Sequence, residues 1–554
     1  MTSKYCLILL FCSVFFACSP SENKEFGKDI STAQDQIREG KAIFKQECSN
    51  CHNFNSNGIG PNLSGLTRTV DTPWIVEFIN NPQAKMDAKD PRALALLEKY
   101  KAVMPSFHVL GEQKINSLIS YLHTFELVQP EIDPDSVINL IEAGVPDSGI
   151  RLELELFAQL PASDSLPPMA KMTKMEPIPG TDRLMINDQR VGIYQLIDQK
   201  PQLYLNLMEQ RPDLVSKPGW GTGLGSFSFH PDFVSNGLFY TAHTEPGGTR
   251  TPDIGYTDSL VVFMQWIVTE WKANDPAALT FEGTSRELLR VNNPTQAHGM
   301  QELTFNPHSK KGSEDYGLLY IGYGDGGSPE RGFPDVADNE AKEIYTGILR
   351  IDPAGRNSRN GNYGIPASNP FAGVAGKAGE VYAYGFRNPN RLFWDDAGNF
   401  YATDIGQHSI EELNLVKAGG FYGWPIREGT FIINPYGNLR KLYPLREDEN
   451  LGITYPLIQL DHDELAAIFA GYIMSYGELK GRFLFGDILS GRLFIADLNQ
   501  KPKPEVQTVK VIFEGKEMTL EELVGGRVDL KFGIDAEKRV YIMSKNEGKI
   551  YLIK

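Results

Sequence analysis

Cysteine is scarce in this chain, and most of it lies at the very start. The 554 residues include five cysteines, and Cys6, Cys12 and Cys18 fall within the first eighteen positions. Only Cys48 and Cys51 are left for the body of the protein. A structural zinc site needs a second pair of ligands beside such a pair, so zinc binding is not expected here.

The chain also lacks an excess of positive charge and, after its first residues, any long hydrophobic run. It carries 54 lysines and arginines against 70 aspartates and glutamates, a net charge of −16 at pH 7. This charge argues against binding to nucleic acid or to anionic lipid, and no later apolar segment is long enough to cross a bilayer. The length predicts two or three domains, and a hydrophobic content of 41% lets them bury a sizeable core.

The first residues read as an export signal. Lys4 precedes an apolar stretch, residues 5–17, that is too short to span a membrane comfortably. The end of this stretch, Phe15-Phe16-Ala17-Cys18, resembles a bacterial lipobox, in which the cysteine is acylated; an ordinary cleaved signal is the alternative. We expect a signal peptide at residues 1–17, a lipid anchor at Cys18 on a membrane leaflet facing the periplasm or the cell surface, and a tether at residues 18–30.

The two remaining cysteines form the pattern Cys48-Ser49-Asn50-Cys51-His52, which has the spacing that attaches haem covalently to a polypeptide. Each thiol can bond one vinyl group of the porphyrin, and the histidine that follows then lies under the iron. The same spacing can also belong to a redox-active disulfide. The sequence predicts haem c, with Cys48 and Cys51 as covalent attachment points and His52 as an iron ligand.

The sixth iron ligand is expected downstream of the haem motif. Met104, in Ala102-Val103-Met104-Pro105, is the candidate, because a thioether ligand raises the reduction potential and is typical of electron-transfer haems. Met86 is the alternative ligand, and Met104 would then be a core residue.

Helical periodicity surrounds these residues. An inner helix is expected around residues 74–79, and a final helix is predicted by apolar residues at helical spacing: Ile115, Leu118, Ile119 and Leu122. In this order of elements, residues 31–127 resemble a class I cytochrome c along their whole length. The resemblance implies that the carbonyl of Pro61 accepts a hydrogen bond from His52 and fixes its ring.

From about residue 150, after a linker at residues 128–149, the pattern changes from helical to β. Short strands rich in Val, Ile, Tyr and Phe alternate with Gly, Pro and Asn turns. One hairpin pattern recurs, and its tyrosines Tyr240, Tyr320 and Tyr401 are about 80 residues apart. Such repeats predict a β-propeller with long inserted loops, with a β-sandwich or β-helix as the alternative. The predicted protein is multidomain, all-α and then all-β.

Seven motifs of the β region follow one another in an order that resembles a known family. They are Gly223-Leu224-Gly225 with Phe229-His230-Pro231-Asp232-Phe233, Gly324-Asp325-Gly326-Gly327, Leu349-Arg350-Ile351-Asp352-Pro353, Gly385-Phe386-Arg387-Asn388-Pro389, Thr403-Asp404-Ile405-Gly406-Gln407, Glu411-Glu412-Leu413-Asn414 and Gly419-Gly420-Phe421-Tyr422-Gly423-Trp424-Pro425. Residues 150–554 resemble the glucose/sorbosone dehydrogenase family, soluble quinoproteins built on a six-bladed propeller. The resemblance implies pyrroloquinoline quinone (PQQ) and calcium on top of the propeller, and oxidation of an aldose at its anomeric hydroxyl.

The resemblance also implies roles for individual residues. His298 stands where the family has its general base, and Asp325 is the carboxylate that would hold its tautomer. Arg387 would place its guanidinium against the quinone oxygens, and Asn388 would orient the ring. Each of these residues can instead have a purely structural role; Asp325, for example, can simply be a turn residue. Calcium is implied at two backbone carbonyls: those of Gly406 and Gln407.

Several positions depart from the family pattern. Gly221 stands in place of a glutamine, Ala297 in place of an aspartate, and Ser475 in place of a basic residue that pairs with a cofactor carboxylate. Of a late pair of arginines, only Arg527 remains nearby. PQQ has three carboxylates, and each lost charge-assisted hydrogen bond would cost about 1.5–3 kcal/mol of binding free energy.

Two functions therefore remain open. In the first, a lipid-anchored dehydrogenase oxidises a sugar or related alcohol on the propeller and passes electrons through the haem to an exported acceptor. Fusion to a cytochrome favours this, because it holds the acceptor at high effective concentration. In the second, a non-enzymatic propeller with a degenerate PQQ site binds a carbohydrate or a protein, beside an electron-transfer cytochrome.

Overall fold

The structure is a computed structural model of the chain, and it describes residues 26–49, 51–54, 57, 60–100, 103–127, 136–137, 140–217, 221–256, 260–446 and 450–554. The expected signal peptide at residues 1–17, the expected lipid anchor at Cys18 and part of the expected linker at residues 128–149 lie outside the described residues. None of the described helices is both long and apolar enough to cross a membrane.

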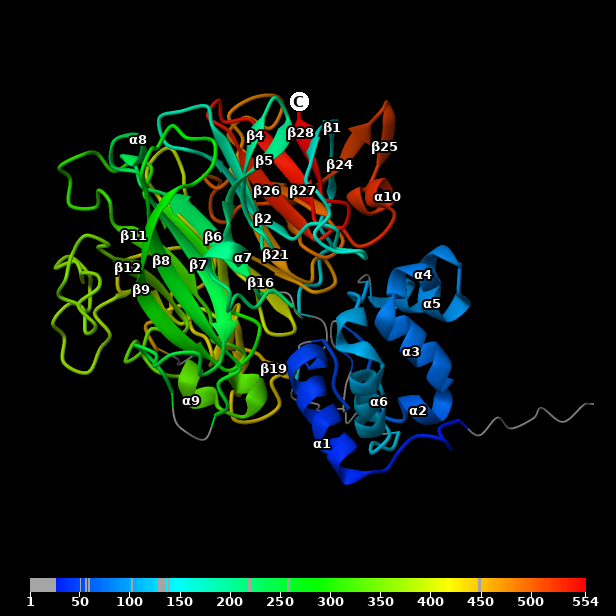
Figure 1. The fold of residues 1–554 in the computed structure, drawn as a ribbon. Coiled ribbons are helices and arrows are strands. Elements are labelled where there is room, and N and C mark those ends of the chain that lie inside the picture. Colours follow the sequence, from blue (N-terminus) through cyan, green and yellow to red (C-terminus); the bar gives the residue numbers. More distant parts are fainter. Residues whose placement is uncertain are drawn as a thin grey trace, which may run out of the picture.

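The first domain is a bundle of short helices (Figure 1). They are α1 (Gln34–Ile43), which continues as the π-helical turn η1 (Phe44–Cys48), α2 (Leu66–Thr69), α3 (Thr72–Asn80), α4 (Pro82–Asp87), α5 (Pro91–Tyr100), the 3-10 turn η2 (His108–Leu110) and α6 (Gly111–Leu122). Helices α1 and α6 pack so closely that only glycine fits at position 40: a Cβ added at Gly40 would lie 1.9 Å from the carbonyl oxygen of Ser117. The expected inner helix is α3 and the expected final helix is α6, whose four apolar residues are buried.

The second domain is a propeller, and its described strands form six four-stranded blades. The first three blades are β2 (Met172–Pro177), β3 (Leu184–Asp188), β4 (Gly192–Ile197) and β5 (Lys200–Asn206); β6 (Leu224–Phe229), β7 (Leu238–Pro246), β8 (Met264–Ala273) and β9 (Gly283–Asn293); and β10 (Met300–Phe305), β11 (Leu319–Tyr323), β12 (Gly347–Ile351) and β13 (Val381–Tyr384).

The other three blades continue the ring. They are β14 (Pro389–Trp394), β15 (Phe400–Asp404), β16 (Ile410–Leu415) and β20 (Ile458–Asp461); β21 (Ile468–Ile473), β22 (Phe483–Asp487), β23 (Leu493–Ala496) and β24 (Val506–Phe513); and β26 (Leu530–Ile534), β27 (Val540–Ser544), β28 (Lys549–Ile553) and β1 (Asp147–Gln159). Smaller elements decorate them: α7 (Leu207–Gln210), α8 (Phe233–Asn236), η3 (Pro329–Arg331), α9 (Pro334–Ala337), β17 (Arg427–Glu428), β18 (Phe431–Ile433), β19 (Leu442–Tyr443), β25 (Lys516–Met518) and α10 (Leu520–Val524).

The two ends of the propeller domain meet in one blade. Strand β1, the first of the domain, pairs antiparallel with β28, the last, so that Leu154 lies opposite Ile553. It also pairs in parallel with β24 of the preceding blade. This closure ties the start of the domain to its end.

The recurring tyrosines of the sequence occupy equivalent places in the ring. Tyr240, Tyr320 and Tyr401 lie in β7, β11 and β15, the second strands of three successive blades. The chain therefore takes about 80 residues from one of these strands to the next, as the tyrosine spacing in the sequence indicates. The prediction of a propeller with long inserted loops is confirmed.

The inner strands β2, β6, β10, β14, β21 and β26 surround the axis of the propeller. A buried ion-pair network crosses this axis. Nζ of Lys174 lies 2.8 Å from one carboxylate oxygen of Glu302, and Nη1 of Arg391 lies 2.9 Å from the other. The three side chains come from β2, β10 and β14, so the network joins three blades.

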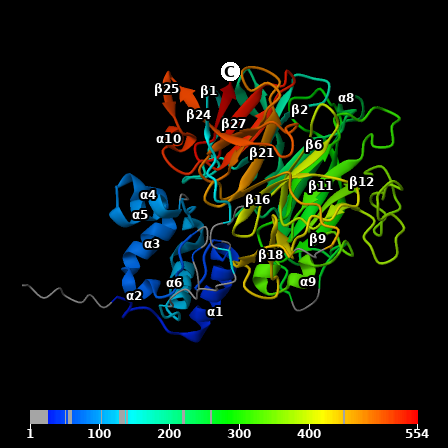
Figure 2. The same ribbon diagram turned by 180° about the vertical axis from the view of Figure 1, so that it is seen from behind.

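The helical domain lies against one end of the propeller (Figure 1 and Figure 2). Nε2 of Gln296 donates to the carbonyl oxygen of Gln46 at 2.8 Å and also to the carboxylate of Glu47. Farther out, Nε2 of Gln83 donates to the carbonyl oxygen of Gly525 at 2.9 Å. The two domains are therefore joined by specific hydrogen bonds.

Candidate functional site

A cavity of about 240 Å³ lies at the mouth of the propeller, where the six inner strands begin. Each strand contributes from its first residues or from the loop just before it. In chain order these residues include Lys171 and Thr173, Gly221 and Gly225, His298 and Gln301, Asn388 and Asn390, Ala467 and Phe469, and Asp529 and Lys531. The helical domain contributes Glu47, Cys51 and residues 105–109, so the cavity lies between the two domains.

The expected base and its partner meet at this mouth. Nδ1 of His298 lies 2.6 Å from Oδ1 of Asp325, whose other oxygen accepts from Nε1 of Trp424 at 3.1 Å. With Nδ1 held in this way, Nε2 is the nitrogen left to act on a substrate. Burial alone would raise the pKa of Asp325, but the charge and the hydrogen bond of His298 lower it overall, which favours the ionised carboxylate.

The backbone around His298 turns tightly. Its φ angle is +53°, a left-handed conformation that is uncommon outside glycine and often marks functional positions. Two glycines make room for this turn. A Cβ added at Gly299 would lie 1.8 Å from Nε1 of Trp266, and one added at Gly324 would lie 2.7 Å from the carbonyl oxygen of His298.

Asp404 holds the pair Arg387 and Asn388, which the resemblance assigned to the cofactor. The backbone N–H groups of Arg387 and Asn388 donate to its carboxylate at 2.9 and 2.6 Å. Both side chains line the cavity. Oδ1 of Asn388 is buried and finds no hydrogen-bond partner among the described residues, so it is an acceptor that a bound ligand can satisfy.

The carbonyl of Gly406, an expected calcium ligand, faces a guanidinium instead. Nη1 of Arg387 donates to it at 2.6 Å and to the carbonyl of Ile405 at 3.1 Å, while Nε of Arg387 donates to Oε1 of Gln407 at 2.7 Å. The described residues hold no cluster of three or more His, Cys, Asp or Glu that could bind a metal ion. As it stands, this donor set does not fit calcium, and calcium at Gly406 and Gln407 stays a prediction that requires Arg387 to move.

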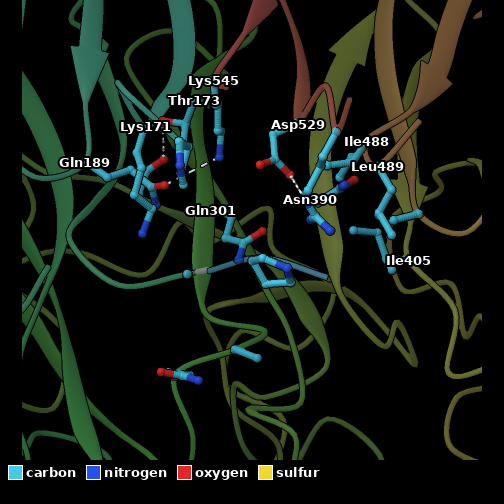
Figure 3. A pocket seen from close by; sticks show the side chains of 18 of the residues that line it. Lys171, Thr173, Gln189, Gln301, Asn390, Ile405, Ile488, Leu489, Asp529 and Lys545 are labelled. Atoms are coloured by element: carbon cyan, nitrogen blue, oxygen red, sulfur yellow. Dashed lines mark hydrogen bonds and ion pairs between the residues drawn. The ribbon is translucent and has the colours of Figure 1, made fainter. Parts of the chain in front are cut away.

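Three buried lysines that the sequence did not single out also line the cavity: Lys171, Lys531 and Lys545. Figure 3 shows Lys171 and Lys545 near Gln189, on the opposite side of the view from Ile488 and Leu489. Burial, together with mutual repulsion, lowers the pKa of Lys171 to about 7, and burial lowers that of Lys545 to about 8. The pKa of Lys531 is also lowered by burial and by Lys545. The wall is therefore suited to an anion.

These lysines are basic side chains at the mouth that the comparison with the family pattern did not include. Gly221 and Ala297 do line the cavity, without the side chains of the family pattern. Ser475 is half-buried and is not among the residues that line the cavity, and its hydroxyl lies 3.4 Å from the carbonyl oxygen of Lys538. Arg527 faces the cavity. Basic side chains reach the mouth from other places: Lys171 lies just before β2, Lys531 lies on β26, and Lys545 lies in the turn after β27.

A second, mostly apolar cavity lies within the helical domain and has the expected haem residues in its wall. Cys48, Cys51 and His52 line it together with both candidate sixth ligands, Met104 and Met86, so the choice between the methionines stays open. Aliphatic and aromatic side chains form most of the rest, among them Phe44, Leu63, Leu66, Trp74, Ile75, Phe78, Ile79, Leu96, Val103, Phe107, Leu110, Leu118 and Leu122. Such a wall fits a porphyrin.

The haem motif is preorganised. Nδ1 of His52 donates to the carbonyl of Pro61 at 2.9 Å, which confirms the expected contact and leaves Nε2 for iron. Glycine is needed at position 60 to leave room for the imidazole ring of His52, because a Cβ at Gly60 would lie 2.3 Å from Cε1 of that ring. Burial raises the pKa of the Cys48 thiol and raises that of Cys51 to about 11, while it lowers the pKa of His52, so the histidine is neutral and able to bind metal.

The two cavities share a wall. Six residues line both: Glu47, Cys51, Pro105, Phe107, Leu489 and Arg527. Cys51 is an attachment point of the haem, while Leu489 and Arg527 belong to the propeller. A group bound at the propeller mouth would therefore lie next to the cavity that holds the haem motif.

Comparison with known families agrees with this architecture. The family model described as Glucose / Sorbosone dehydrogenase matches residues 170–518. The chain belongs to the glucose/sorbosone dehydrogenase family. A Cytochrome c model matches residues 37–126, the helical domain, and with the haem motif it makes haem c a cofactor of this family member.

Individual relatives of this dehydrogenase family are distant. The human Hedgehog-interacting protein is 29% identical over 399 residues, which cover 68% of this chain and 49% of that protein. Quinoprotein glucose dehydrogenase B of Acinetobacter calcoaceticus is 27% identical over 230 residues, 39% of this chain and 42% of that protein. The chain thus spans about half the length of the curated relatives it matches.

A solved structure shares the fold. The apo form of the soluble aldose sugar dehydrogenase of Escherichia coli matches with a TM-score of 0.51 at 16% identity, covering 73% of this chain and 99% of that one. At this identity the likeness supports the propeller fold alone.

Proposed function

We propose that this protein is an exported quinohaemoprotein that oxidises a sugar or a related alcohol at the propeller mouth and passes the electrons to haem c. The observation that carries the proposal is the cavity itself, which presents the His298–Asp325 pair and shares a wall with the haem cavity. The family match and the similarity to a quinoprotein glucose dehydrogenase support a sugar as substrate and PQQ as cofactor.

The residues at the mouth fit PQQ. Its three carboxylates match the buried amines of Lys171, Lys531 and Lys545, and a carboxylate restores the charged form that burial disfavours. Oδ1 of Asn388 is a buried acceptor still to be satisfied. When bound, PQQ supplies an acceptor for the hydride that leaves the carbon of the alcohol.

His298 performs the acid–base part of the reaction. Its Nε2 takes the proton of the substrate hydroxyl, and Asp325 stabilises the imidazolium that forms. Arg387, held against the Ile405 and Gly406 carbonyls, places positive charge at the cavity wall.

The electrons leave one at a time. Oxidation of the alcohol releases two electrons, and a c-type haem carries one. We therefore propose that they cross the shared wall singly and pass from the haem to an exported acceptor. The export pattern of residues 1–17 and the lipobox-like segment ending at Cys18 support a place on a membrane surface outside the cytoplasm.

The test uses the purified, haem-loaded, oxidised protein. PQQ is added with and without calcium, followed by a panel of aldoses, and the haem absorbance is recorded. The proposal predicts haem reduction that requires both PQQ and a sugar, and omission of each is the control. If no aldose reduces the haem and a direct titration shows no binding of PQQ, the proposal fails.

A second function has its own support. The glutamine and the aspartate of the family pattern are replaced at the cavity wall by Gly221 and Ala297, and the chain is similar to a protein named for an interaction rather than a reaction. A propeller that binds a carbohydrate or a protein beside an electron-transfer cytochrome would show no PQQ binding in the titration.

A further inference from the structure

The loop that carries Met104 touches both domains. This ligand loop, residues 103–108, lies between α5 and α6, and Val103, Met104, Pro105 and Phe107 line the haem cavity. Within the helical domain its second half is anchored on the end of α3. The backbone N–H of Phe107 donates to the carbonyl of Ile79 at 2.9 Å, and the hydroxyl of Ser106 donates to that of Asn80 at 2.5 Å.

The propeller holds the same loop at both of its ends. At the first end, Nη1 of Arg527 donates to the carbonyl oxygen of Val103 at 2.7 Å. At the other end, a carboxylate oxygen of Asp164 lies 3.5 Å from Nε2 of His108. The carbonyl contact joins residues 424 positions apart in the chain and sits directly beside Met104.

Both propeller side chains are themselves fixed. Nε of Arg527 lies 2.7 Å from Oδ1 of Asp529, and the Arg527 side chain is 7% exposed. The Asp164 side chain is 6% exposed and lies 2.8 Å from Nζ of Lys217. Groups held this firmly can restrain a loop, because little conformational freedom remains to be lost when the contact forms.

We propose that the propeller clamps the ligand loop and thereby sets the coordination and the reduction potential of the haem, with Arg527 as the main positioning residue. Among the described residues of the loop, the first hydrogen bond to the rest of the helical domain is that of Ser106, after the methionine, so the clamp on Val103 restrains the segment that presents the thioether. Arg527 also lines the haem cavity, and its positive charge favours the reduced iron, which carries one positive charge less.

This inference takes Met104 as the sixth ligand, and it does not depend on catalysis by the propeller. It is tested on the full-length, haem-loaded protein without quinone or sugar, so its failure is distinguishable from failure of the proposed dehydrogenase. Two quantities are measured: the haem reduction potential by spectroelectrochemistry, and the weak red absorption band of methionine-ligated ferric haem.

Three variants separate the clamp from general loosening of the interface. Arg527→Gln should lower the potential and weaken the methionine band, and Asp164→Asn should weaken the band by a smaller amount. Gln83→Ala is the matched control, because it removes the interdomain bond to Gly525, two residues before Arg527, without touching the ligand loop. It should leave both quantities at the wild-type value.

Arg527→Lys keeps the positive charge and an N–H donor at this position, so its haem reduction potential should be close to the wild-type value. This variant also tests the proposal if Arg527→Gln fails to fold. The proposal is overturned if Arg527→Gln leaves the potential and the band unchanged, or if Gln83→Ala shifts them as far. Absence of the methionine band in the wild-type protein would also overturn it.

Discussion

At the scale of single residues, His298 is the position whose removal should separate the two chemistries of the chain. His298→Ala removes the only base that we assign to the substrate hydroxyl, so sugar-dependent haem reduction should fall by about 10²–10⁴-fold. The haem spectrum should not change, since His52 and both candidate methionines lie in the other domain. Turnover is followed by haem absorbance under saturating PQQ and sugar.

A matched control is His308→Ala, which makes the same chemical change at an exposed turn on the propeller. It should retain wild-type turnover. If His298→Ala keeps wild-type turnover as well, the role of His298 as base is wrong.

The buried lysines make a pH-dependent prediction. The pKa of Lys171 is lowered to about 7 and that of Lys545 to about 8, so at pH 8 the first is mostly neutral and the second is half protonated. Carboxylates that arrive beside them raise both pKa values, so binding of PQQ at pH 8 should take up between one and two protons at this pair. Calorimetric titration in buffers of different ionisation enthalpy measures this number directly.

The proton uptake on PQQ binding should depend on pH. Below pH 6 Lys171 and Lys545 are already charged, and the proton uptake at this pair should disappear. Lys171→Gln should reduce the uptake at pH 8 and weaken PQQ binding, whereas Lys200→Gln, at an exposed site, should change neither. Binding without proton uptake at pH 8 would contradict the assignment of these lysines to the carboxylates.

Sequence reasoning succeeded at residues whose chemistry is contiguous in the chain. The haem motif is five successive residues, and the resemblance to a class I cytochrome c implied the His52–Pro61 contact nine residues on. It missed Lys171, Lys531 and Lys545, because each looks like an ordinary strand or turn residue until β2, β26 and the β27–β28 turn are brought to one mouth. A charged residue between buried apolar neighbours, as in Leu530-Lys531-Phe532, was the available signal.

At the scale of elements, the ion-pair network across the propeller axis should contribute to stability. Glu302 on β10 is paired with Lys174 on β2 and Arg391 on β14, and its side chain is 2% exposed. Glu302→Gln keeps the size of the side chain but leaves two buried cations without that carboxylate, so it should lower the free energy of unfolding by about 3–5 kcal/mol. Chemical denaturation followed by tryptophan fluorescence measures the change.

Glu282→Gln serves as the control for this substitution, because Glu282 is exposed beside β9 and its loss should change the free energy of unfolding by less than about 0.5 kcal/mol. Equal destabilisation by the two variants would mean that the axial network adds nothing of its own.

The elements themselves were predicted unevenly. The propeller could be read from its tyrosine spacing because second strands recur once per blade. Helices α4 and α5 were missed although both carry a start signal, an Asn or Asp followed by proline. Oδ1 of Asn81 accepts from the N–H of Ala84, and Oδ1 of Asp90 accepts from that of Ala93, so both act as helix caps.

At the scale of the whole molecule, the domain contact is the feature that sequence could not provide. Gln296 and Gln46 are 250 positions apart, and Arg527 and Val103 are 424 apart, so no local pattern links them. The contact brings Cys51 and Arg527 into the walls of both cavities, and burial at this interface raises the pKa of Glu47 to about 7. We propose that this docking allows electrons to pass from the propeller mouth to the haem within one molecule.

The most direct test of the account is therefore the kinetics of haem reduction. PQQ-loaded, oxidised protein is mixed with a reactive sugar in a stopped-flow instrument, and the rate constant of haem reduction is measured over a wide range of protein concentration. The account predicts a first-order rate constant that does not depend on protein concentration, because quinone and haem share a wall in one chain. A rate that rises in proportion to protein concentration, or no reduction at all, would contradict it.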